Sequence, residues 1–264
     1  MKYGFIGSGV MGSALALAVS KAGVEMLLVS DTDQAKAGAL ASAVGGQAVS
    51  NQEIAERAER IFLAVKPQYM AGMFEGIREI LAGRKDRFVI VSMAAGLTIN
   101  KIKQLAGGDY PVIRIMPNTP AAIGQGVVIV SPDSLVTAEE VDEVKNALSA
   151  AGKIVPLPEK LLDAGGSISG CGPAFVDLFV EALADGGVLC GVPRVEAMEL
   201  AAQMVLGSAA LILESGRHPG QLKDAVCSPG GTTIEGVKAL EEGAFRATVM
   251  NAVIAAWKKN KELG

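Results

Sequence analysis

A chain of 264 residues is long enough for one large domain or two ordinary ones. Half of its residues are hydrophobic but only 4% are aromatic, so the core must be built from aliphatic side chains. The net charge of -4 argues against nucleic acid as the main partner, and three cysteines without a C-x-x-C pair are typical of reduced thiols in a cytoplasmic protein. Uncharged runs such as 115–132 contain Pro, Gly and Asn, which makes them poor membrane spans.

Short apolar runs alternate with helical patterns over the first part of the chain. Helices are expected from about Met11, from Thr32, after a cap at Asn51, and over 137–150, where Thr137 and Glu140 have capping-box spacing. Strands are expected at 3–6, 26–29, 61–65, 88–92, 112–116, 127–130 and 154–155. This alternation predicts an α/β fold with a Rossmann-type doubly wound sheet, parallel in the main.

The character of the sequence changes after Pro156-Leu157-Pro158, where strand-like runs disappear. Helices are expected over 173–190, 193–215, 232–242 and 245–262. We therefore predict a dinucleotide-binding domain at 1–157 and an all-helical domain at 158–264. The helix at 195–214 is apolar on more than one face, which predicts a homodimer interface through the C-terminal helices.

A glycine-rich loop, Gly7-x-Gly9-x-x-Gly12, joins the first predicted strand to the first helix. In that context the spacing predicts a dinucleotide site, because the helix N-terminus presents free N–H groups to a pyrophosphate. Asp31 ends the second strand, where an acid accepts hydrogen bonds from a ribose 2′-hydroxyl or, alternatively, only caps the next helix. Ser30, Thr32 and Lys36 are positioned to hold a 2′-phosphate instead, so NADH and NADPH both stay open.

A second glycine-rich helix start lies near the other end of the chain, at Cys227-Ser228-Pro229-Gly230-Gly231-Thr232-Thr233-Ile234-Glu235-Gly236. Its backbone N–H groups and hydroxyls suit the carboxylate of a small acidic substrate. The alternative is a capped helix turn without a ligand. The functional question is whether this site works together with the first loop.

Several motifs, in order and at matching spacing, resemble pyrroline-5-carboxylate reductases over nearly the whole chain. They are Gly4–Gly12, Ala64-Val65-Lys66-Pro67, Ala94-Ala95-Gly96, Arg114-x-Met116-Pro117-Asn118-Thr119-Pro120, Ser169-Gly170-x-Gly172-Pro173-Ala174 and the 227–236 stretch. The family reduces the cyclic imine 1-pyrroline-5-carboxylate to L-proline with NAD(P)H. The resemblance implies a helical dimerisation domain, active sites that use helices from both subunits, and dimers that assemble further.

The resemblance also assigns residues to the two ligands. It implies cofactor contacts at Gly7, Ser8, Gly9, Val10, Met11, Gly12, Ser30, Asp31, Asn51, Ala64, Val65, Lys66, Pro67, Ala94, Ala95, Met116 and Pro117. It implies substrate contacts at Asn118, Ser228, Gly230, Gly231, Thr232 and Thr233, with the Thr233 hydroxyl facing the ring nitrogen. Because the loop after the second strand varies in the family, the resemblance does not fix the role of Asp31.

Imine reduction needs little acid–base machinery, because a protonated imine is already electrophilic and must mainly be held beside the nicotinamide. This fits a chain with one histidine, and we expect Thr233 to orient the nitrogen rather than act as a strong acid. No metal site is expected: Asp177, Glu181 and Asp185 form a helix stripe without a partnering His, and His218 is expected in a surface turn.

Two other functions are compatible with a glycine-rich loop of this kind. A 3-hydroxyacid dehydrogenase of the 6-phosphogluconate type needs a catalytic lysine, and the corresponding stretch, 170–177, has none. A nicotinamide-binding regulator without catalysis would keep the 7–12 loop but would not need the 228–233 site.

Overall fold

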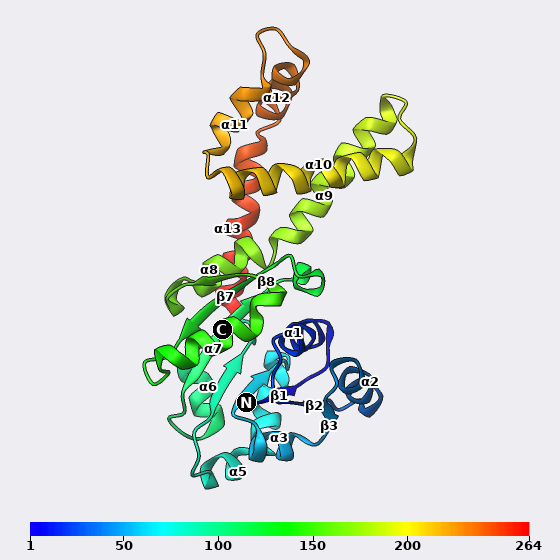
Figure 1. Cartoon of the computed structure of the whole chain (residues 1–264). Helices are drawn as coiled ribbons and strands as arrows, with labels where there is room; N and C mark the ends of the chain where they lie inside the picture. The colour runs from blue at the N-terminus through cyan, green and yellow to red at the C-terminus, as the bar shows by residue number, and fades with distance from the viewer. Residues whose placement is uncertain (264) are drawn as a thin grey trace. The chain divides into compact units, whose positions relative to one another are not determined.

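The computed structural model describes residues 1–263 and divides the chain into two compact units. The first unit holds residues 1–171 together with the C-terminal segment from Ala256, and the second holds 172–255. Each is described by itself (Figure 1).

The first unit is built on one eight-stranded sheet in the order β3-β2-β1-β4-β5-β6-β7-β8. All neighbours are parallel except β6 and β7, which pair antiparallel. The strands are β1 (Lys2–Ile6), β2 (Met26–Ser30), β3 (Gln47–Ala48), β4 (Arg60–Leu63), β5 (Val89–Ser92), β6 (Val112–Pro117), β7 (Gly126–Pro132) and β8 (Gly152–Pro156). The strand order reverses between β1 and β4, and ligands of such sheets bind outside the carboxyl ends at that point.

The predicted doubly wound, mainly parallel sheet is confirmed, and every predicted strand is present. The strand expected at 61–65 ends at Leu63, so Ala64 and Val65 lie beyond it. β3 was missed because both of its residues are exposed and show no apolar alternation.

Helices cover both faces of the sheet. On one face, α1 (Val10–Ser20), α2 (Gln34–Val44) and α7 (Ala138–Leu148) bury aliphatic side chains such as Leu15, Leu40 and Val144. On the other face lie α3 (Asn51–Arg57), α4 (Met70–Glu75), α5 (Arg78–Gly83) and α6 (Ile99–Ala106). Short 3₁₀ turns are η1 (Pro67–Tyr69), η2 (Thr119–Ile123) and η3 (Ser149–Ala151).

Two expected helix starts were wrong by one or two residues. α2 begins at Gln34 and is capped by the Asp33 carboxylate, which accepts from Ala35 N and Lys36 N, so Asp31 is not the cap. α3 is capped by Ser50 in a capping box with Glu53, and Asn51 is its first helical residue. Asn51 is thereby free to accept a hydrogen bond elsewhere. The capping box of Thr137 and Glu140 on α7 is confirmed.

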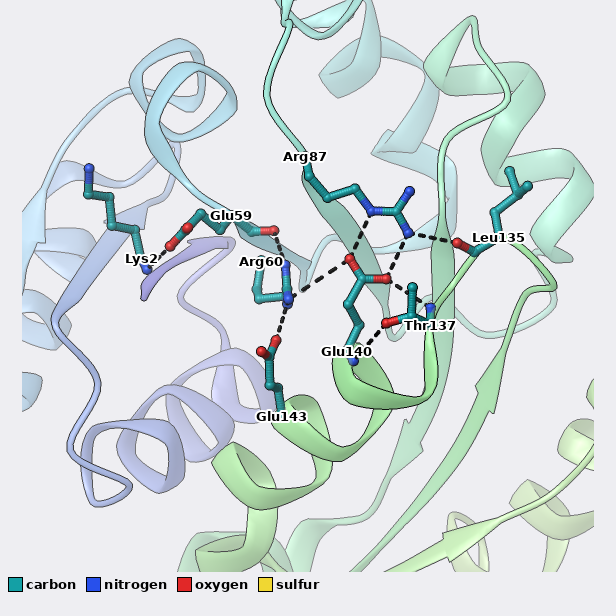
Figure 2. Close-up of polar contacts among 8 residues, drawn as sticks. All are labelled: Lys2, Glu59, Arg60, Arg87, Leu135, Thr137, Glu140 and Glu143. Carbon is teal, nitrogen blue, oxygen red and sulfur yellow. Dashed lines mark hydrogen bonds and ion pairs between the residues drawn. The ribbon is translucent and has the colours of Figure 1, made fainter.

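An ion-pair cluster ties α7 to the starts of β4 and β5 (Figure 2). Arg87 donates twice to the buried Glu140 carboxylate, at 2.9 and 2.8 Å, and Arg60 pairs with Glu143. Glu140 also accepts from the backbone N–H of Thr137 at 2.9 Å. The Arg87 hydrogen bonds hold the pKa of Glu140 below its ordinary value. This cluster lies at the amino ends of β4 and β5, opposite the edge where ligands bind.

The helix α8 (Glu159–Ser169) was missed by the sequence analysis and belongs to the first unit. It packs on β6 and β7, with Gly165 and Gly166 against Ile129 and Met116. The compact units therefore divide after Cys171, whereas the expected domain boundary falls at 157/158. The double proline marks the end of the sheet, and α8 follows it without leaving the sheet's surface.

The second unit is helical, as predicted. It contains α9 (Gly172–Leu189), α10 (Arg194–Ser215), α11 (Pro219–Val226), α12 (Thr232–Glu242) and the greater part of α13 (Phe245–Leu263). α9 and α10 pack on each other around Ala184, Ala197 and Ala201. The expected turn at His218 begins α11, an eight-residue helix that was missed. There His218 Nδ1 accepts from Gly220 N at 3.1 Å.

Two helical stretches, 159–189 and 194–215, are long and apolar enough to cross a membrane by length and composition alone. The first combines α8 and α9, and α8 lies against the sheet. Apolar helix faces of this kind are equally expected where a second protein copy covers them.

Candidate functional site

A pocket of about 640 Å³ lies at the carboxyl ends of β1, β2 and β4, where the strand order reverses. Residues from the first glycine loop, the end of β2, the start of α3 and the stretch after β4 surround it. They are Ile6, Gly7, Gly9, Asp31, Thr32, Lys36, Asn51, Ala64, Val65, Lys66, Tyr69, Gly72 and Met73. The predicted loop, strand end and Lys66 segment are therefore brought together by the fold.

Glycine suits each of the three positions Gly7, Gly9 and Gly12 for a different physical reason. Gly7 has φ +107, a conformation that L side chains rarely adopt, and an added Cβ would lie 2.5 Å from Ala64 O. At Gly12 a Cβ would lie 2.4 Å from Gly7 O, so only glycine lets α1 start this close to the strand. At Gly9 a Cβ would meet nothing within 4 Å, because this position faces the open pocket.

The start of α1 is open to an anion. Gly9 is the N-cap and provides no side-chain hydrogen bond, so the first-turn N–H groups of α1 keep their capacity to donate. A helix N-terminus in this state attracts a phosphate through its N–H groups and its dipole. The glycine cradle and the pocket beside it fit a dinucleotide pyrophosphate.

Asp31 is bound to the glycine loop. Its Oδ2 accepts from Ser8 N at 2.6 Å, and its Oδ1 accepts from Asp33 N at 2.9 Å. Burial acts to raise the pKa of Asp31, but the hydrogen bonds from Asp33 and Ser8 outweigh it and leave the pKa below its ordinary value. The carboxylate is therefore ionised at neutral pH and lines the pocket together with Thr32 and Lys36.

Ten of the predicted cofactor residues do not line this pocket. Ser30 is buried and donates to Asn51 Oδ1 at 2.6 Å, which links the end of β2 to α3. Ser8 is buried under the loop, and Val10 is 79% exposed at the start of α1. The predicted cofactor contacts that lie outside the lining of this pocket are Ser8, Val10, Met11, Gly12, Ser30, Pro67, Ala94, Ala95, Met116 and Pro117.

Sequence reasoning missed Tyr69, Gly72 and Met73, which line the pocket from η1 and α4. Tyr69 is 63% exposed, and such a large exposed aromatic ring beside a pocket offers a stacking surface. The available signal was their position directly after the predicted Lys66-Pro67 motif.

Asn118, expected to contact substrate, has both ends of its amide engaged by the backbone. Its Oδ1 accepts from Val127 N at 2.8 Å, and its Nδ2 donates to Ser169 O at 2.9 Å. The residue is only 8% exposed. Its position joins the end of β6 to β7 and to the end of α8.

The second glycine-rich stretch forms the start of α12. Gly230 has φ +68 and open space around it, and Gly231 is the N-cap without a side-chain hydrogen bond. Ser228, Thr232 and Thr233 are exposed, and within residues 1–263 their hydroxyls have no hydrogen-bond partner. The N–H of Gly231 donates to Ser228 O at 3.0 Å, but the first-turn N–H groups of α12 and the neighbouring hydroxyls keep their capacity to donate to a carboxylate.

The remaining titratable candidates do not form a metal centre. Among the described residues, no group of three or more His, Cys, Asp or Glu side chains could hold a metal ion. Asp185 pairs with Arg194 at 2.6 Å, while Asp177 and Glu181 line a separate pocket of about 460 Å³ with Met198. All three acids lie on the stripe of α9 that their spacing predicted.

Known proteins match the chain over its whole length. A family model for pyrroline-5-carboxylate reductase dimerisation matches residues 159–263, and one for coenzyme F420-dependent NADP oxidoreductase matches 2–96. The chain is 41% identical to the pyrroline-5-carboxylate reductase of Synechocystis over 268 residues (100% of this chain, 98% of that protein). It is also 41% identical to that of Escherichia coli over 266 residues (99% and 98%).

Solved structures agree with these similarities. The crystal structure of the Plasmodium falciparum pyrroline carboxylate reductase with NADP bound is 34% identical, with a TM-score of 0.88 over 100% of this chain and 98% of that chain. The Coxiella burnetii pyrroline-5-carboxylate reductase is 29% identical, with a TM-score of 0.92 over 99% and 98%. Both sequence and fold are therefore shared along the entire chain.

Proposed function

Because the chain belongs to the pyrroline-5-carboxylate reductase family, we propose that its two glycine-rich helix starts divide the work of that reaction. The enzyme reduces 1-pyrroline-5-carboxylate to L-proline with NADH or NADPH, the last step of proline biosynthesis. In our proposal the pocket beside Gly7–Gly12 holds the dinucleotide, and Ser228–Thr233 hold the imino acid.

The cofactor assignment rests on the open cradle at Gly9. A Cβ there would point into the pocket without touching protein, so the backbone is shaped to admit a ligand at close range. The free N–H groups of α1 would hold the pyrophosphate, and Asp31, Thr32 and Lys36 would surround the ribose. When bound, the dinucleotide supplies the hydride. The other cofactor residues, at 64–67, 94–95 and 116–117, remain part of this proposal.

The substrate assignment rests on the exposed donors of α12. The N–H groups at Gly230 and Thr232 and the hydroxyls of Ser228 and Thr232 would hold the carboxylate, while the N–H of Gly231 donates to Ser228 O and shapes the turn. The Thr233 hydroxyl would hydrogen-bond the ring nitrogen and keep the C=N bond in the orientation that the reaction needs. Because a free threonine hydroxyl is a very weak acid, its expected role is orientation or relay of a proton through water. Asn118 is left out of the substrate set because its amide is already engaged.

The alternative functions are set aside by family membership. The stretch 170–177 lacks the lysine that alcohol oxidation would require, and the full-length similarity is to reductases. A regulator without catalysis would leave the unpartnered donors of α12 without a purpose.

We also propose a homodimer through the C-terminal helices, supported by the match to the family's dimerisation region at 159–263 and by the apolar faces of α10. A higher assembly of dimers and a cytoplasmic location are further parts of the proposal. Reduced cysteines and a net charge of -4 are consistent with that location. The functional division at 157/158 is supported by the start of the dimerisation match at residue 159.

The decisive experiment is Thr233→Ala. Loss of one hydrogen bond to a reacting, charged group should lower kcat/KM for pyrroline-5-carboxylate by roughly 10- to 100-fold. The Kd of NADH or NADPH, measured by fluorescence quenching, should stay within about two-fold. Thr248→Ala is the matched control, because the Thr248 hydroxyl on α13 donates to the carbonyl of Ala244, the residue directly before that helix. Equal losses in both parameters would contradict the division of labour.

A further inference from the structure

A row of three residues along β6 and just beyond its end contacts α8. Arg114 and Met116 lie on β6, and Asn118 follows the strand directly with an extended backbone, so the three are spaced two apart and point to the same face. Each contacts a different part of α8, which packs on β6 and β7. We call these three residues the α8 anchor row.

Arg114 holds the first turns of α8. Its side chain is 3% exposed, and it donates to Glu159 Oε1 at 3.0 Å and Asp163 Oδ1 at 3.2 Å. The same Glu159 oxygen accepts from Ile99 N, the first residue of α6, at 2.6 Å. Because both acids are about one-third exposed, the ion pairs orient the helix more than they stabilise the fold.

Met116 contacts the middle of α8. A Cβ added at Gly166 would lie 3.1 Å from Met116 Cγ, and one at Gly165 would lie 2.7 Å from Ile129 Cδ1. Ile129 is the cross-strand partner of Met116 on β7. Two consecutive glycines weaken a helix by about 1 kcal/mol each. Here they let α8 approach the two strands.

Asn118 holds the end of α8. Its Nδ2 donates to the carbonyl of Ser169, the last residue of the helix, while Val127 N fixes its Oδ1. Two residues later the first unit ends, and α9 begins at Gly172. The anchor row therefore sets the position from which the chain leaves the first unit.

We infer that the α8 anchor row, Arg114, Met116 and Asn118, is a set of positioning residues for the reduction. The inference rests on the proposed function, because the unit that begins after Cys171 carries Ser228–Thr233. A shift at the end of α8 is passed to the first residue of α9. Since a misplacement of about 1 Å can cost about 100-fold in rate, loosening the row at Arg114 or Asn118, neither of which our proposal assigns to a ligand, slows turnover.

The test begins with Asn118→Ala and Asn118→Asp, assayed well below the melting temperature of each variant. Both lose the donor to Ser169 O, and Asp keeps an acceptor for Val127 N. We expect both to lower kcat to a similar extent, roughly 10- to 100-fold, with the Kd of NADH or NADPH within about two-fold of wild type. If Asn118 instead bound the substrate carboxylate, Asp would raise KM far more than Ala with kcat retained. That outcome would overturn the inference.

A second variant perturbs the other end of α8 and keeps the test valid if position 118 does not tolerate change. Glu159→Gln with Asp163→Asn removes both negative charges that pair with Arg114, and we expect kcat to fall about 3- to 10-fold with nucleotide Kd unchanged. Lys160→Gln, on an exposed position of the same helix, is the control. A wild-type kcat in the double variant overturns the inference. If the wild-type protein failed to reduce pyrroline-5-carboxylate, the proposed function itself would be wrong.

Discussion

The two units of this protein differ in how much of themselves they bury. The first unit encloses two hydrophobic clusters, one on each face of its sheet, around residues such as Phe5 and Phe74. The second buries a cluster of three alanines, while Leu200, Leu206 and Leu213 of its α10 are 64%, 57% and 84% exposed. A unit with so little core is completed by another surface, and the family's dimerisation match at 159–263 contains the whole of this unit.

The same contrast separates the two proposed ligand sites. The glycine loop at 7–12 is held by residues of its own chain: the Asp31 carboxylate accepts from Ser8 N, and Ala64 packs closely against Gly7. The start of α12 has exposed donors and no side-chain cap. The first site is therefore ready in a single chain. We expect the second to work only when its unit is held in an assembly.

The largest expected effect comes from Leu206→Glu, which tests whether the second unit depends on a partner. A charge placed in an apolar interface costs several kcal/mol, so the dimer should dissociate. Activity should fall at least about 100-fold, while the monomer still binds nucleotide. Sedimentation and fluorescence quenching measure the two properties. Leu135→Glu, at an exposed apolar position of the first unit, is the control, and a fully active monomer would refute the expectation.

The next effect concerns the first site alone. Asp31→Ser removes the ionised carboxylate and leaves Thr32 and Lys36 facing the pocket, so the ratio of kcat/KM for NADPH over NADH should rise about 10-fold, or about 1.4 kcal/mol. Lys36→Gln should move the ratio in the opposite direction. Steady-state kinetics with both cofactors provide the measurement. An unchanged ratio would mean that Asp31 serves only to hold Ser8 N.

The local backbone demands of this fold were predictable from sequence. Gly7 is required by its positive φ, and Gly12 by the close approach of α1 to the carbonyl of Gly7. Both requirements involve only a few residues that are close in sequence. The capping box of Thr137 and Glu140 is a similarly local feature. The role of Asp31 stayed open at that stage. Only the folded chain shows that Asp33 caps α2 while Asp31 binds the glycine loop.

The contacts of α8 could not be derived from local patterns. Gly165 and Gly166 have low helix propensity, so the sequence around them does not predict α8. The helix is stabilised by its packing on β6 and β7. The motif around Asn118 was recognised, but its hydrogen-bond partners are nine and 51 residues away in sequence. Such long-range hydrogen bonds decide whether an amide is free to bind substrate or is engaged by the backbone, and the spacing of residues along the sequence does not predict them.

The smallest expected effect tests the stability of the first unit through Glu140. Its folded-state pKa is lowered, first by the Arg87 hydrogen bonds, so its ion pair stabilises the fold above about pH 4.3. That contribution is lost as the pH falls through the lower, folded-state pKa. Glu140→Gln should therefore reduce the free energy of unfolding by about 1–2 kcal/mol at pH 7, and by much less near pH 3.

Urea unfolding of the wild type and Glu140→Gln at both pH values measures this difference. Glu79→Gln is the control, because Glu79 is exposed and makes no ion pair within residues 1–263. Arg87 is 53% exposed and so screened by water, which is why the expected effect is modest. The cluster lies at the amino ends of β4 and β5, away from the pocket, so kcat at pH 7 should not change. A large loss of kcat would mean that the first unit transmits strain across its whole sheet.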